Sequence, residues 1–194
     1  MSPTQIVVLI IIVAVIVAVA LLARRQLRRR SLQKTFGPEY DRVVAEQDNR
    51  TAAERELRDR ERRHAELQLT PLSTQSTAQY SAAWEEVQIR FVDAPDEAVG
   101  TADELVTRLI AERGYPTGNY DDQLAHLSVR HAQTLQHYRG AHEISQRSER
   151  GEATTEDLRQ ALVHYRALFA DLLGEDPIHH DAGVDTSRPD ATSR

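Results

Sequence analysis

Histidines are the residues of this chain whose spacing most directly tests for metal chemistry. The sequence contains eight, and four of them lie close together: His126, His131, His137 and His142. Two metal ligands on one helix must lie three or four residues apart, because only then do both rings project from the same face. These four are separated by five, six and five residues, and no His-Glu-x-x-His motif occurs. The sequence therefore predicts no metal and no other cofactor.

The tripeptide His-Tyr-Arg occurs twice, at residues 137–139 and 164–166. Histidine and tyrosine side chains transfer protons in many enzymes. One hypothesis is therefore a membrane-bound enzyme that uses His131, Tyr138 and His164 between the last two helices. The alternative is that the two tyrosines anchor buried helix faces. We favour this alternative, because the residues that flank the two tripeptides do not extend the match.

The short motifs of nucleophilic and phosphate-handling enzymes are missing from the sequence. It contains no Gly-x-Ser-x-Gly turn, no Gly-x-Gly-x-x-Gly turn and no Gly-x-x-x-x-Gly-Lys phosphate loop. It also contains no cysteine, which excludes disulfides, thiol catalysis and lipid anchoring through a cysteine. No catalytic or cofactor-binding residue is assigned.

An apolar segment near the N-terminus must position everything that follows it. Residues 6–23 are all Ile, Val, Leu or Ala, and fourteen of these eighteen are Ile, Val or Leu. As a helix this run is about 27 Å long, close to the ~30 Å hydrocarbon core of a bilayer. A cleaved signal peptide, the alternative, would have basic residues before the run and few after it, whereas this order is reversed here. We expect a transmembrane helix that contacts the lipid bilayer through residues 6–23.

A basic cluster follows the apolar run directly, and consists of Arg24, Arg25, Arg28, Arg29, Arg30 and Lys34. Such residues beside a membrane helix remain in the cytoplasm, which places the N-terminus outside the cell and the C-terminal domain inside it. Arginines at this position also contact anionic headgroups, each contributing about 1 kcal/mol. The sequence therefore predicts a single-pass protein of the cell membrane.

The distribution of charge argues against nucleic acid as a partner. Six of the 24 basic residues and none of the 30 acidic residues fall within residues 1–34. The rest of the chain holds 18 basic against 30 acidic residues, a net charge of −12. An acidic body is repelled by a phosphate backbone.

Apolar residues recur at helical spacing along the body, and no stretch shows sustained strand alternation, so the fold class is all-α. We expect a tail and transmembrane helix over 1–23, a basic juxtamembrane segment over 24–37 and charged stalk helices over 38–70. A helical bundle over 71–174 and a disordered tail over 175–194 follow. The stalk has a thin apolar stripe, which predicts a solvated spacer helix. A short coiled coil is also compatible with this stripe. Its N-cap is expected at Thr51 in a capping box with Glu54, and the last helix has a similar pair in Thr154 and Asp157.

The candidate interaction surface combines the corner "RFVDAPDE" with the loop "RGYPTGNYDD". Its residues are Arg90, Asp93, Tyr115, Pro116 and Tyr120. Aromatic residues in loops are common in recognition sites. The alternative, equally compatible with the sequence, is that these aromatic rings pack the loop onto the core.

Five segments carry a resemblance: "FGPEYDR", "ERRHAEL", "RFVDAP", "ERGYP" and "ATTEDLRQAL". With them the chain resembles an uncharacterised family of short bacterial single-pass membrane proteins that have an Arg-rich juxtamembrane segment and a helical body. The resemblance covers nearly the whole chain except the tail. It implies a membrane anchor, and no functional residues carry over.

Together these features predict a membrane-anchored protein-interaction or scaffold module with a protein partner. Self-association of the anchor through Ala14 and Ala18 is a further possibility.

Overall fold

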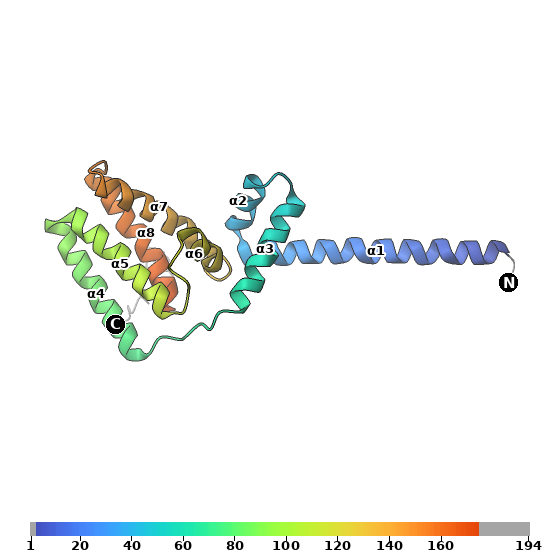
Figure 1. Cartoon of the computed structure of the whole chain (residues 1–194), viewed down its shortest axis with the longest axis horizontal. Coiled ribbons are helices and arrows are strands. Elements are labelled where there is room, and N and C mark those ends of the chain that lie inside the picture. The colour runs from blue at the N-terminus through green and yellow to red at the C-terminus, as the bar shows by residue number, and fades with distance from the viewer. Residues whose placement is uncertain (1–2, 175–194) are drawn as a thin grey trace, which may run out of the picture.

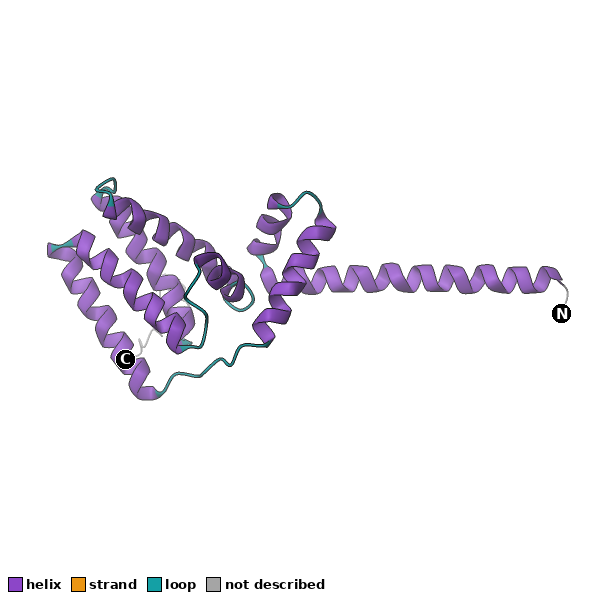
Figure 2. Ribbon diagram, viewed as in Figure 1, coloured by secondary structure: helices purple, strands orange, loops and turns teal. Residues whose placement is uncertain are grey.

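The computed structural model is built from helices joined by short loops (Figures 1 and 2). It describes the backbone of residues 3–174 and the side chains of residues 11–174, and over these residues every regular element is an α-helix. The all-α prediction is therefore confirmed; the predicted tail over 175–194 lies outside the described residues. The elements are α1 (Pro3–Phe36), α2 (Pro38–Glu46), α3 (Arg50–Ala65), α4 (Thr74–Asp93), α5 (Pro95–Glu112), α6 (Tyr120–Leu127), α7 (Ala132–Glu149) and α8 (Thr155–Leu173).

Helix α1 is the longest element and projects away from the rest of the molecule (Figure 1). It includes both the apolar run and the basic cluster, and it ends where Gly37 adopts a positive φ of 46°. Among the side chains that the structure describes, no helix carries an apolar stretch long enough to cross a membrane. Residues 6–10 of the predicted span lie outside those side chains. The membrane span over 6–23 therefore stays a prediction.

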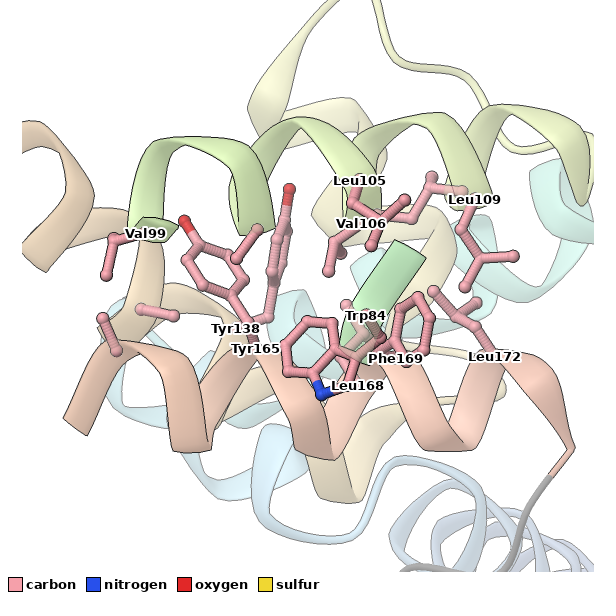
Figure 3. Packing of buried hydrophobic residues seen from close by; sticks show 14 of the residues in the cluster. Trp84, Val99, Leu105, Val106, Leu109, Tyr138, Tyr165, Leu168, Phe169 and Leu172 are labelled. Carbon is pink, nitrogen blue, oxygen red and sulfur yellow. The ribbon is translucent and has the colours of Figure 1, made fainter. Parts of the chain in front are cut away.

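The largest core lies between α4, α5, α7 and α8, with α6 beside α7; we call α4–α8 the bundle. Helix α5 packs against α4 and α8, and α7 packs against α8, so that 21 buried side chains form one apolar cluster. Helix α4 contributes Trp84 and Val87 to this core, and both are buried. Figure 3 shows Trp84 beside Phe169, whose ring centroid lies 4.7 Å away in a stacked arrangement.

A second, smaller core lies where the end of α1 meets α2 and α3; we call residues 24–65 the collar. Its six buried side chains are Leu32, Phe36, Tyr40, Val43, Ala53 and Leu57. The structure differs here from the expected solvated stalk. The apolar stripe of α3 is indeed thin, but side chains from α1 and α2 complete the core that it begins.

The ends of the helices follow local chemistry in most places. Pro38 occupies the first turn of α2, and Thr154 and Asp157 form the predicted capping box of α8. The expected cap at Thr51 is wrong by two residues: Asn49 is the N-cap of α3, and its side chain accepts a hydrogen bond from the Ala52 amide at 2.9 Å. Thr and Asn both favour this position, so the sequence alone did not separate the two.

Candidate interaction site

The five residues of the predicted interaction surface do not form one surface. Arg90 and Asp93 are exposed near the end of α4, just before α5 begins. Tyr115 and its neighbours follow the other end of α5, and a helix of 18 residues is about 27 Å long. Pro116 and Tyr120 are half-buried, and Tyr120 stacks on His142 with ring centroids 4.3 Å apart. The corner and the loop therefore lie at opposite ends of the bundle.

Tyr115 is buried, with 4% of its surface exposed, so it does not offer a contact to a partner. Its hydroxyl lies 3.1 Å from His131 Nε2, and His131 Nδ1 lies 3.0 Å from Asp171 Oδ2. Thr134 donates a hydrogen bond of 2.7 Å to the same oxygen. The tyrosine thus fastens the loop after α5 to the start of α7 and the end of α8. This is the alternative that the sequence left open for the loop aromatics.

A tyrosine, a histidine and a carboxylate in series resemble the order of groups in a proton relay. Two observations favour a structural role. Tyr115 and His131 are both buried, and the Nδ1 of His131 makes no well-aligned hydrogen bond despite its short distance to Asp171. Burial raises the pKa of Tyr115, which opposes formation of a phenolate. Burial also acts to raise the pKa of Asp171, but contacts with His131 and Thr134 outweigh it and hold that pKa below its usual value.

The structure does not bring together the three residues of the enzyme hypothesis. Tyr138 is buried beside Tyr165, with ring centroids 6.1 Å apart. His164 lies beside His137, whose ring centroid is 5.0 Å away. His131 instead contacts Tyr115. Within the described part of the chain, no three His, Asp or Glu side chains are grouped so that they could hold a metal ion.

A groove lies between α4 and α8. It encloses about 240 Å³, and its lining includes Trp84 and Phe169 together with Glu85 and Arg166. Trp84 Nε1 is buried and has no hydrogen-bond partner within the described chain. A buried donor without an acceptor costs about 1–3 kcal/mol, so a ligand that supplies an acceptor here gains affinity.

Two large apolar side chains are exposed on α4, the helix that forms one side of this groove. Ile89 and Val92 have 72% and 82% of their surface exposed, the largest fractions among the exposed apolar side chains of the described bundle. Helix α4 lies at the edge of the bundle far from the free end of α1 (Figure 1). The sequence pattern did not single out these two residues, although each is a large apolar side chain among mostly polar exposed positions of the helix.

Glu39 of the collar binds three guanidinium groups, and one of them, that of Arg139, belongs to the bundle. Its side chain is 3% exposed, and Arg139 of α7 donates two hydrogen bonds to it, of 2.8 and 2.9 Å. Arg42 donates two more, and Arg60 of α3 donates one of 3.2 Å. Burial alone would raise the pKa of Glu39, but Arg42 and Arg139 outweigh it and lower the pKa to about 2.

The residues of the predicted basic cluster lie along the C-terminal part of α1. The side chains of Arg24, Arg25, Arg28, Arg30 and Lys34 are exposed, and that of Arg29 is half-buried.

Comparison with known proteins gives no indication of function: no family model, no curated protein and no solved structure matches the chain. The geometry of its own residues therefore carries the functional argument.

Proposed function

We propose that this chain is a membrane-anchored interaction module, in which α1 crosses the cell membrane and the bundle binds a helix of a protein partner in the cytoplasm. The groove between α4 and α8 is the docking site, and the partner also covers Ile89 and Val92, which are exposed on α4 outside the lining of the groove. The exposed apolar side chains of this helix pair are the single observation on which the docking role rests.

The free part of α1 supports the anchoring half of the proposal. The described side chains from residue 11 to residue 23 are all apolar and all exposed, on every face of the helix. A helix that is apolar all round needs an apolar environment on all sides. Basic residues follow at once from Arg24, so the positive-inside rule places the collar and bundle in the cytoplasm.

The shape and chemistry of the groove support a helical partner. A volume of about 240 Å³ accommodates one or two large side chains rather than a whole small-molecule ligand. Amphipathic helices place such side chains at spacings of three and four residues along a groove. Glu85 and Arg166, which also line the groove, provide charges of both signs for the polar edge of such a helix.

The anchoring half is tested by the fractionation and orientation of the full chain. The chain is expected to remain in the membrane fraction after extraction with high salt or carbonate. A reporter that is active only in the cytoplasm, fused after Arg194, is expected to be active. Recovery of the chain in the soluble fraction contradicts the anchor. A reporter that is active only outside the cell contradicts the orientation.

The docking half is tested by site-specific photocrosslinking in cells. A photoreactive amino acid in place of Gln88, which lines the groove, is expected to capture a partner; the same amino acid in place of the exposed Gln160 of α8 is the control. Ile89→Asp should weaken binding about 10- to 100-fold, since burial of an isoleucine contributes about 1.5–3 kcal/mol. Gln160→Asp adds the same charge and should leave the crosslink unchanged. Equal crosslinking at both positions, or insensitivity to Ile89→Asp, would rule out this groove.

A further inference from the structure

A second hollow lies in the collar, between the basic part of α1 and the first half of α3. It encloses about 430 Å³ and is lined by Arg25, Arg28 and Arg29 of α1 together with Arg50, Glu54 and Arg58 of α3. Arg50 and Arg58 are distant in sequence from the basic cluster, and the fold adds them to it. Five guanidinium groups and one carboxylate thus surround one space.

The arginines of this hollow lack the carboxylate partners that several other arginines of the collar have. Arg42, Arg60, Arg62 and Arg63 each form an ion pair with a carboxylate. None of the five that line the hollow forms one within the described chain. Glu54, the single acid in the hollow, accepts a hydrogen bond of 3.1 Å from the Tyr40 hydroxyl. The five guanidinium groups of the hollow therefore share a single lining carboxylate, which leaves an excess of positive charge.

Arg29, one of the lining residues, has a buried Nε with no hydrogen-bond partner within the described chain. Guanidinium groups bind phosphate oxygens through paired N–H donors, and several of them around one space suit a group with several oxygens. The guanidinium groups of the hollow therefore suit an anion that carries a phosphate group.

The position of the hollow along α1 indicates the source of that phosphate. Arg25, Arg28 and Arg29 follow the last residue of the apolar run by two, five and six positions, or about 3–9 Å along the helix axis. The headgroup layer of one leaflet is about 5–7 Å thick. We propose that the α1/α3 hollow binds the phosphate of an anionic phospholipid headgroup. This inference rests on the membrane anchor of the proposed function, and it adds Arg50 and Arg58 as ligands.

The experiment uses the full-length protein in neutral detergent micelles and measures lipid binding by native mass spectrometry. The probes are phosphatidylglycerol, phosphatidylcholine and inorganic pyrophosphate. The double variant Arg50→Gln/Arg58→Gln removes two charges from the hollow. Arg55→Gln/Arg62→Gln removes two exposed charges from the same helix outside it and is the matched control. Thermal unfolding of both variants checks that the collar remains folded.

The wild-type chain is expected to retain phosphatidylglycerol in preference to phosphatidylcholine. Each arginine near a headgroup contributes about a factor of five, so the hollow variant should bind phosphatidylglycerol about 20- to 30-fold more weakly. The control variant should change binding less than about threefold. Equal losses in the two variants would overturn the site, because general charge attraction would then explain the binding.

Pyrophosphate separates a lipid from a soluble source of phosphate. If pyrophosphate binds the lipid-free chain through Arg50 and Arg58 and phosphatidylglycerol does not displace it, the lipid assignment is overturned. Displacement of pyrophosphate by phosphatidylglycerol supports it. Failure of the proposed function has a different result: the chain would be absent from cell membranes, whatever lipid it binds in micelles.

Discussion

Glu39 in the collar and Asp103 in the bundle are both carboxylates at which three helices meet. Glu39 of α2 binds arginines of α2, α3 and α7, and is almost completely buried. Asp103 of α5 accepts a hydrogen bond of 2.5 Å from Tyr165 of α8 and lies 3.2 Å from His142 Nδ1 of α7. One carboxylate thus has three permanently charged partners, whereas the other has a neutral hydroxyl and an imidazole.

The apolar surroundings of the two carboxylates explain this difference. The collar buries six apolar side chains, whereas the bundle buries 21. Hydrophobic stabilisation grows with buried apolar area, so the bundle depends little on any one polar contact. The collar has a smaller apolar contribution, and Glu39 with Arg139 is a well-buried ion pair that attaches it to the bundle, beside the more exposed pair of Arg63 with Asp122. The two regions should therefore fail under different perturbations.

The largest expected effect is that of Glu39→Gln. Removal of one member of a buried ion cluster costs about 3–5 kcal/mol, because it leaves Arg139 without a carboxylate, whereas Arg42 and Arg60 keep their pairs with Glu46 and Glu56. The collar should separate from α7 while the bundle remains folded. Hydrogen exchange should therefore become faster in residues 38–65 and remain slow in α5 and α8.

Glu46→Gln is the control for this variant. Glu46 pairs only with Arg42 and has 54% of its side chain exposed, so its loss should cost less than about 1 kcal/mol. If Glu39→Gln destabilised the bundle as much as the collar, the two regions would be one cooperative unit and the comparison would fail.

Low pH should weaken the same contact between the collar and the bundle without any substitution. The pKa of Glu39 is about 2 in the folded chain against its usual 4.5, so its contribution is complete above pH 4.5 and is lost as the pH falls toward 2. A shift of this size corresponds to about 3 kcal/mol. Amide exchange followed between pH 5 and pH 3 should show the collar loosening first. Glu39→Gln should lack this pH-dependent step, and a step that persists in the variant would assign it to another group.

The sequence predicted most of the bundle, because its helices carry wide apolar faces and strong end signals. The capping box of Thr154 and Asp157 was expected to begin the last helix, and it is observed. The collar was not predicted. Its core combines single side chains from three helices, and Glu39 meets an arginine 100 residues away in sequence. No local pattern reports such a pairing.

The candidate site shows the same limit. The basic cluster was visible as a run of charge, but Arg50 and Arg58 join it only through the packing of α3 on α1. The position of Tyr115 in a loop predicts an exposed interaction residue, whereas the structure places its side chain in a buried contact with His131. Loop position indicates exposure only on average, and a buried acceptor across the fold is not visible in the sequence.

Asp103→Asn should have a smaller effect than Glu39→Gln, and so sharpens the comparison. The asparagine retains an oxygen that accepts from Tyr165, and the loss should be about 1–2 kcal/mol, the scale of one hydrogen bond to a charged group. Unlike Glu39→Gln, it should lower the midpoint of thermal unfolding of the bundle. Tyr165→Phe removes the donor of this hydrogen bond, so the charge of Asp103 no longer strengthens it, and the two changes together should cost less than their sum. Strict additivity would show that the charge of Asp103 does not strengthen this hydrogen bond.

The smallest expected effects come from removing one helix cap in each region. Asn49→Ala and Thr154→Ala should each cost about 1 kcal/mol, because each side chain accepts a hydrogen bond from the first turn of its helix. Equal local losses should have unequal results. Thr154→Ala should lower the free energy of unfolding of the whole bundle, whereas Asn49→Ala should speed hydrogen exchange only in α3 and its collar neighbours. Thr51→Ala is the control, since Thr51 lies inside α3 and caps nothing. A cost at Thr51 equal to that at Asn49 would move the start of α3, and with it the position of Arg50 at the basic hollow.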